Sequence, residues 1–435
     1  MSRSLISNPN LVESPYITAT LGPHKLGTYA QTEVVNRLGI ATRTQFPNYI
    51  HSLNVTKVNG VVNTYNFQMI YQIRAGNDPN YVDKLLSSVS DTRKIVFSYG
   101  DSSSPSFIFK EEEAIINKVV SNVDFANSCI TYNITATSSS NLLAGTKFNF
   151  SKVTDKPSNV ILRTLYNKKY GLCDTFTGMR DKNAVLKNNL IAMDDQVVEI
   201  EARNNISPLD YLTYLVNCMI SIESATYKEF KTRYMISVND DTKGLMSGAY
   251  FKVTKISNKI KMVDSLDTFE VDVGYPGNNF VTQFQVQDDQ SWAILYNYSD
   301  RIDQPNYTYR IDNSGNIISE YAPTVTYSSQ LMKETTASKV WWNNVTQFPI
   351  KATLKIKGLI RPAILMSNLR VNALFYGQKH SSSGLYVITK QVDTINASGY
   401  STTLDLLRIG ADNSDLGVVR SGTAGDQGRA KEVVK

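Results

Sequence analysis

The sequence predicts a mainly β protein with a smaller helical part, which places it in the α+β class. The 435 residues include 25 Tyr and 16 Phe, and broad aromatic rings pack well on a pleated sheet. Several segments alternate apolar and polar residues, which is the pattern of a half-buried strand. Hydrophobic residues make up 42% of the chain and charged residues 19%, so the chain can bury a substantial core.

The first region, residues 1–142, is predicted to be a β-domain. The string "TYNFQMIYQI" (64–73) alternates large apolar side chains with mostly amide side chains, so one face of this strand should be buried and the other exposed. The polar string "TSSSN" (137–141) interrupts the strand pattern and marks the expected end of the domain.

Residues 143–233 are predicted to form a helix-containing domain. Ser207 stands at the expected N-cap of a helix, Pro208 in its first turn and Asp210 three residues after the cap. This is a capping-box arrangement, in which the two polar side chains satisfy backbone groups at the start of the helix.

Strands return after about residue 234. Residues 234–345 are expected to be a β-rich domain, and residues 346–410 a further β-segment in which "PIKATLKIKGL" (349–359) alternates most clearly. Residues 411–435 are punctuated by Gly and poor in large apolar groups, which predicts a flexible tail.

A hairpin pattern occurs twice, in residues 115–137 and in residues 387–409. Each copy has an apolar strand that carries a lysine, Lys118 or Lys390, then a polar turn with small residues and an alternating return strand. The two turns differ in length by about two residues. One interpretation is an internal duplication that produces two related β-barrel domains; the other is that two unrelated hairpins look alike.

No constellation for catalysis is recognisable. There is no G-x-G fingerprint and no G-x-S-x-G elbow, and the three histidines lie in no metal-binding motif. Acidic clusters such as Glu111–Glu113 and Asp194-Asp195 are interpreted as solvated turns and strand edges, because neighbours on a strand face opposite ways. Three widely spaced cysteines predict free, buried thiols. We therefore expect no enzymatic activity, no metal and no cofactor.

The net charge of +6 is small for a chain of this length. It does not indicate a dedicated nucleic-acid binder, which concentrates Lys and Arg on one face, but it leaves room for transient contact with a polyanion. No signal peptide is recognisable, and no apolar run is long enough to cross a bilayer. We expect no membrane-spanning segment.

Two sets of residues are candidates for a functional surface. Lys351, Lys355 and Lys357 share one face of a predicted strand; this face could line a channel through which DNA passes, or be a solvated face, or protect a sheet edge from pairing. Trp341 and Trp342 are adjacent and should face opposite ways, so one is expected in the core and the other at an interface.

The closing hairpin "GLYVITKQVDTINASGYSTTLDLLRIG" (384–410) resembles the end of the last barrel in bacteriophage baseplate and tail hub proteins, a family shared with contractile injection systems and type VI spike proteins. "TRKIVFSYGDSSSPSFIF" (92–109) and "SPLDYLTYLV" (207–216) are also similar to hub sequences. The resemblance implies two tube-like antiparallel β-barrel domains, the first in 1–142 and the second discontinuous and completed by 346–410, with inserted domains between them. No β-helical needle follows, so a spike would be a separate chain.

The resemblance also implies a function, that of a structural hub in a phage tail or baseplate. Such a hub is a homotrimeric ring in which three chains present six barrels to a six-fold tail tube and keep three-fold symmetry for a spike or plug protein. Its partners would be the tail tube or other tail proteins, the spike, and DNA in transient contact during ejection. It would belong to the virion and assemble in the cytoplasm of the bacterial host.

An alternative function is that of a receptor-binding or cell-wall-degrading tail protein. Such a protein needs a sugar cleft with stacked aromatic residues, or two opposed carboxylates. The many tyrosines keep this alternative open.

Overall fold

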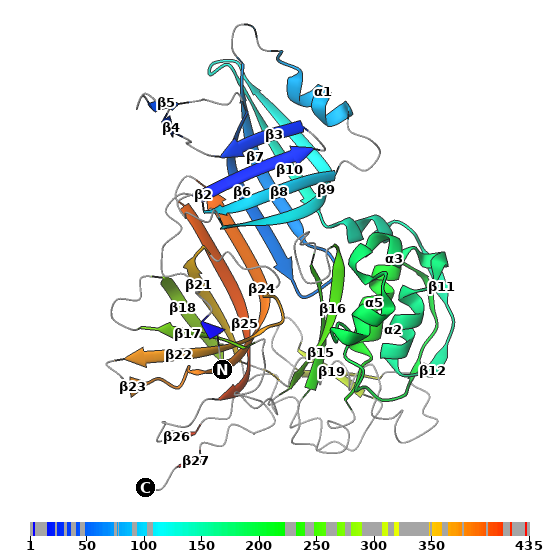
Figure 1. The fold of residues 1–435 in the computed structure, drawn as a ribbon. Coiled ribbons are helices and arrows are strands. Elements are labelled where there is room, and N and C mark those ends of the chain that lie inside the picture. The colour runs from blue at the N-terminus through cyan, green and yellow to red at the C-terminus, as the bar shows by residue number, and fades with distance from the viewer. Residues whose placement is uncertain are drawn as a thin grey trace.

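The computed structural model describes residues 3–4, 15–21, 24–29, 33–35, 41–43, 48–73, 76, 78–88, 94–101, 108–221, 232–239, 248–257, 268–274, 280–288, 307–311, 317–321, 348, 350–358, 364–375, 378–396, 399–411, 418–419 and 431–432. Strands predominate, and fifteen of them belong to one sheet. Figure 1 shows this sheet as an upper and a lower part, with a helical region beside them.

The upper part of the sheet contains five strands that we call unit 1. These are β6 (Asn48–Val58), β7 (Thr64–Gln72), β8 (Lys94–Asp101), β9 (Ile108–Asp124) and β10 (Cys129–Thr137). They lie in the order β6–β7–β10–β9–β8, and each neighbouring pair is antiparallel. β2 (Pro15–Leu21) continues the sheet beside β8, and β3 (His24–Tyr29) follows beside β2. The apolar side of unit 1 forms one core with β2 and with α1 (Tyr81–Ser88).

The lower part contains five strands that we call unit 2. These are β18 (Val281–Asp288), β21 (Ile350–Lys357), β22 (Asn368–Phe375), β24 (Gly384–Asn396) and β25 (Gly399–Ala411). They lie in the order β18–β21–β25–β24–β22, again with each neighbouring pair antiparallel. β17 (Thr268–Val273) pairs with β22 in parallel, β1 (Arg3–Ser4) pairs with β17, and β23 (Gln378–Lys379) pairs with β22. A second core lies under this unit.

The two units share their strand order, their strand directions and the positions of two β-bulges. The β9–β10 hairpin has a bulge at Asn117, and the β24–β25 hairpin has one at Thr389, in each case next to the lysine of the repeated pattern. β6 has a bulge at His51, where it pairs with β7. β18 has one at Thr282, where it pairs with β21, and the registers place the two bulges at equivalent positions. Bulges re-aim a strand and are specific features of a fold, so the match favours internal duplication.

The hairpin turns also agree with the duplication. The turn of unit 1 spans residues 125–128 and that of unit 2 spans 397–398. The second turn is therefore two residues shorter, as the sequence comparison predicts. Because the pairing from each turn to just beyond the bulge stays in the same register, the paired residues of β9 and β10 have defined equivalents in β24 and β25.

The helical region follows unit 1 in the chain. Its elements are η1 (Ser139–Ala144), β11 (Phe148–Phe150), β12 (Val153–Asp155), α2 (Pro157–Leu165), η2 (Lys168–Tyr170), α3 (Leu172–Thr175), η3 (Thr177–Met179), α4 (Lys182–Lys187), β13 (Val198–Ile200), β14 (Arg203–Ile206) and α5 (Pro208–Asn217). The capping box at the start of α5 is confirmed: Ser207 Oγ accepts a hydrogen bond from Asp210 N at 3.1 Å and donates one to Asp210 Oδ2 at 2.6 Å. No described helix is both long enough and apolar enough to cross a membrane.

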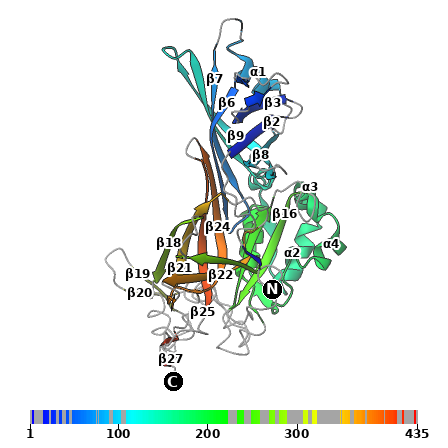
Figure 2. The ribbon, with the colours of Figure 1, turned by 60° about the vertical axis from the view of Figure 1, so that its left-hand side comes forward.

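A hairpin of β15 (Thr232–Asn239) and β16 (Tyr250–Ser257) lies between the helices and the sheet (Figures 1 and 2). Tyr234 and Val253 belong to the core of the helical region, whereas Met235 and Ile256 belong to the core of unit 2. The remaining strands form three separate pairs, β4 (Glu33–Val35) with β5 (Ala41–Arg43), β19 (Tyr307–Ile311) with β20 (Ile317–Tyr321), and β26 (Val418–Val419) with β27 (Lys431–Glu432).

The prediction of a mainly β protein with a smaller helical part is confirmed, but the described strands form one large, mostly antiparallel sheet and do not close two barrels. In unit 1 the return contact from β3 to β6 is a single bridge, Thr28↔Tyr49. In the described part of unit 2, β17 and β18 do not pair with each other. The predicted division at residues 142, 233 and 345 stays a prediction, although β15 and β16 pack against the helices and β18 belongs to unit 2.

Candidate functional site

One face of the sheet is polar across eight neighbouring strands. In pairing order these are β18, β21, β25 and β24 from unit 2, followed by β6, β7, β10 and β9 from unit 1. Strand residues alternate between two faces, and the opposite face carries the two cores. We call this surface the polar face; its exposed or half-buried side chains include Gln283, Gln285, Gln287, Lys351, Lys355, Thr403, Lys390, Thr394, Asn54, Asn66, Gln68, Asn133, Asn122 and Lys118.

The predicted lysine face is part of the polar face. Lys351 and Lys355 are exposed and Lys357 is half-buried, while Leu354 between them is fully buried on the other side. β21 pairs with β18 along one edge and with β25 along the other. The interpretation that these lysines protect a sheet edge is therefore wrong, because the strand is not at an edge. Trp341 and Trp342 lie outside the described residues.

Units 1 and 2 meet at a β-ladder that we call the junction. Residues 390–395 of β24 pair in antiparallel fashion with residues 53–58 of β6, from Lys390↔Val58 to Ile395↔Leu53. β25 occupies one edge of β24 throughout, so β22 and β6 share its other edge, β22 along 384–387 and β6 along 390–395.

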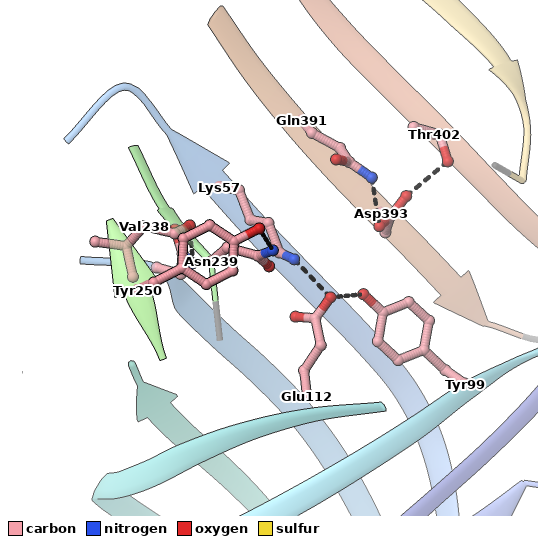
Figure 3. A network of polar contacts seen from close by, with 10 residues as sticks. Lys57, Tyr99, Glu112, Val238, Asn239, Tyr250, Gln391, Asp393 and Thr402 are labelled. Carbon is pink, nitrogen blue, oxygen red and sulfur yellow. Dashed lines mark hydrogen bonds and ion pairs between the residues drawn. The ribbon is translucent and has the colours of Figure 1, made fainter. Parts of the chain in front are cut away.

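The junction encloses a network of buried polar side chains (Figure 3). Lys57 Nζ of β6 lies 2.5 Å from Glu112 Oε1 of β9, and the hydroxyl of Tyr99 of β8 donates to the same oxygen at 2.9 Å. Lys57 and Glu112 are 6% and 2% exposed. Removing one partner of such a pair leaves a buried charge, which is much costlier than the net stability that the pair provides.

A second cluster of the same network lies on unit 2. Asp393 of β24 accepts a hydrogen bond from Gln391 Nε2 at 2.9 Å and another from Thr402 Oγ1 of β25 at 2.6 Å. The ring of Tyr99 packs edge to face against the ring of Tyr400 on β25, with centroids 6.3 Å apart. Each cluster is thus built from one unit, and the contact between the rings of Tyr99 and Tyr400 joins the two clusters across the junction.

The two tyrosines of the network are held neutral. Burial, assisted by the carboxylates of Glu112 and Asp393, raises the pKa of Tyr99 well above its usual value of 10.0. Burial likewise raises the pKa of Tyr400, with Asp393 as the next cause. Both hydroxyls therefore remain hydrogen-bond donors throughout the neutral range.

The sequence did not identify this network. Glu112 was interpreted as solvated with its acidic neighbours, and this is wrong because it is buried. Asp195 is also buried and accepts hydrogen bonds from the backbone N and the hydroxyl of Ser158 at 2.8 and 2.5 Å; burial raises its pKa. The three cysteines are free as predicted but half-buried rather than buried.

The sequence did contain a signal for the burial of Glu112. Alternation alone would have placed Glu112 on the side of its buried neighbour Ala114.

Comparison with known proteins finds similar structures but no similar sequence. No protein-family model and no curated protein sequence matches the chain. A tail protein from Neisseria meningitidis aligns with 92% of this chain and 98% of its own, at 7% identity and a TM-score of 0.44. A 43 kDa tail protein of a prophage from Shewanella oneidensis aligns with 92% and 99%, at 10% identity and a TM-score of 0.45.

An Escherichia coli component of the type VI secretion system aligns with 84% of this chain and 74% of its own, at 8% identity and a TM-score of 0.39. The similar structures are thus phage tail and type VI secretion proteins, the kinds of protein that the closing hairpin resembles. With TM-scores below 0.5, the alignments carry no functional argument, which rests instead on the sheet itself.

Proposed function

We propose that this chain is a structural subunit of a phage tail, the hub of the tail or baseplate. Three copies form a ring with pseudo-six-fold symmetry that joins a six-fold tail tube to a three-fold spike or plug protein. The proposal is supported by one observation above all: a single chain holds two units of the same strand order, with bulges at the same positions, side by side in one sheet. Three such chains present six equivalent units while the ring remains three-fold.

In this proposal the polar face lines the channel through which DNA is ejected. Its side chains are mostly neutral amides and hydroxyls with a few lysines, and Lys390 Nζ lies 3.5 Å from the Asp405 carboxylate. DNA affinity increases steeply with the number of phosphates that Lys and Arg neutralise. A channel wall with few free cations would let the DNA pass, and Lys351, Lys355 and Lys357 would make transient contacts with it.

The proposed role is mechanical. The hub would be part of the virion, would assemble in the host cytoplasm and would contact the tail tube, the spike and the passing DNA. It needs neither catalysis nor a cofactor.

The mass and symmetry of the native particle test the proposal. We expect particles of three chains by native mass spectrometry and three-fold rings with a central hole in electron micrographs. A particle that remains a single chain at high concentration would contradict it. Hydrolysis of purified bacterial cell wall by the chain would instead support the cell-wall-degrading alternative.

A further inference from the structure

We infer that the ring closes through a β-ladder between β9 of one chain and β18 of the next, in the register that the junction already displays within a chain. The inference rests on the proposed function and adds to it the residues that join the copies. Its basis is the equivalence of the two units, because the strand edge that is paired in one unit is equivalent to an open strand edge in the other.

Each unit leaves one edge unpaired among the described residues. β8 covers β9 only along residues 108–115, so residues 116–124 of β9 pair with β10 on one side and with no described strand on the other. β18 pairs with β21 alone. β9 is equivalent to β24, and its open edge corresponds to the edge of β24 that pairs with β6. β18 is equivalent to β6, and its open edge corresponds to the edge of β6 that pairs with β24. Unpaired edges of this kind are templates for another strand.

The open edge of β9 also exposes apolar side chains that are buried at the equivalent positions of unit 2. Val123 is 52% exposed, whereas its equivalent Ile395 is 0% exposed. Ser121 is exposed as well, whereas its equivalent Asp393 is buried. Phe125, just beyond the strand, is 89% exposed. In unit 2 these positions are covered by β6 of unit 1. On β9 the equivalent positions would be covered by β18 of unit 2 from a second chain.

The register follows from the junction without adjustment. Replacing each residue of the junction by its equivalent in the other unit gives the pairs expected between chains. In these pairs a polar-face residue lies opposite a polar-face residue, and a core-face residue lies opposite a core-face residue. A slip by one residue would exchange the two faces. The expected partners are Val120 with Gln287, Asn122 with Gln285, Ser121 with Val286 and Val123 with Phe284.

The contact between chains differs chemically from the junction. The positions of unit 2 that are equivalent to Glu112 and Tyr99 are Gly384 and Ala373. The buried ion pair therefore has no counterpart in unit 2, the unit that β9 meets in the next chain. Val123 with Phe284 corresponds to the junction pair Ile395 with Leu53, so this position stays apolar. An aromatic residue opposite a β-branched residue is a favourable cross-strand pair.

Paired cysteines test this register. In a chain with Cys129, Cys173 and Cys218 replaced by serine, we would introduce Asn122→Cys together with Gln285→Cys. Directly opposed residues of antiparallel strands have Cα atoms within disulfide range. We expect mild oxidation to link chains covalently into species of up to three on a denaturing gel.

Two control pairs accompany this variant. Asn54→Cys with Thr394→Cys places the same geometry at the junction and should form a disulfide within one chain. Asn122→Cys with Gln287→Cys is two residues out of register, and we expect ~10-fold less product because the Cα atoms then lie beyond disulfide range. If particles of three chains form and the junction control oxidises but the Asn122–Gln285 pair does not, the inference is overturned and the proposed function stands. Single-chain particles overturn both.

A substitution at the exposed valine provides an independent measurement. Val123→Asp should weaken association by about 100-fold or more, because the ladder would bury an unpaired carboxylate. Leu142→Asp, at a residue 55% exposed in the helical region, is the matched control and should leave association unchanged. Both variants should unfold at the same denaturant concentration as the unmodified single chain. Undiminished assembly of the Val123→Asp variant would exclude β9 as the contact.

Discussion

β9 and β24 are equivalent strands in different surroundings. Both begin the long hairpin of their unit, both carry a bulge before a lysine, and both pair with their return strand in the same register. Yet Ile395 on β24 is fully buried and Val123 on β9 is half exposed. The difference lies outside the hairpin, because β6 covers the far end of β24 and no described strand covers the far end of β9.

The comparison teaches that the structure and pairing of the hairpin do not depend on a strand along its outer edge. The burial of its side chains does depend on that strand. The hairpin keeps the same pairing with and without a strand on its outer edge. Where the neighbour is present, buried polar clusters lie on both sides of the junction, joined by the contact between the rings of Tyr99 and Tyr400. Such networks are best attested as devices that specify register. The following variants separate these two roles.

The largest effect is expected from breaking the buried ion pair at the junction. Lys57→Ala should lower the free energy of unfolding by about 3–5 kcal/mol, because Glu112 is left charged and buried. Denaturation with urea measures this. Lys355→Ala, on the exposed polar face, is the control and should change it by less than about 0.5 kcal/mol. The double variant Lys57→Met, Glu112→Gln should recover most of the loss, since Tyr99 keeps an acceptor; no recovery would mean that the charges themselves are needed.

The next effect compares the two equivalent apolar positions directly. Ile395→Ala should cost about 2–5 kcal/mol of stability, because it empties a fully buried site. Val123→Ala should cost less than about 0.5 kcal/mol in the single chain, since the residue is half exposed. Thermal or urea denaturation of both variants checks this. Equal losses would show that β9 is already covered in the isolated chain.

A smaller effect is expected at the two bulges. Thr389 Oγ1 donates to the carbonyl oxygen of Asp405 at 3.1 Å, and Asn117 Nδ2 donates to Thr137 Oγ1 at 2.7 Å. Thr389→Ala and Asn117→Ala should each cost about 0.5–1.5 kcal/mol through the lost hydrogen bond. Similar values would support equivalent bulges, and a large change in only one unit would argue that the bulges arose separately.

The smallest effect in ordinary conditions concerns pH. Folding raises the pKa of Tyr99 and of Tyr400 above 10.0, so the folded state favours the protonated hydroxyls. Their contribution is complete below pH 10 and is lost as the pH rises above it, by about 1.4 kcal/mol per pH unit for each tyrosine. Tyr99→Phe should reduce this alkaline slope by about one such step. A stability that is constant between pH 10 and 11 would contradict the assignment.

The sequence by itself determined the local structure. Alternation identified strands such as Ile350–Lys357 and their buried faces, and the capping box located the start of α5. The repeated hairpin was recognisable down to the two-residue difference in its turn. These features depend on neighbours in the chain, so a period of two or a cap three residues away is enough to reveal them.

Only the tertiary structure decided which edges are covered and which charges are buried. Lys57 and Glu112 are 55 residues apart in the chain, and their contact exists only because two hairpins meet. Lys351 and Lys355 lie on an internal strand because β18 and β25 happen to flank β21. Alternation shows which side chains share a face, but it cannot show what lies against that face or that edge. Sheet pairing between distant segments settles both.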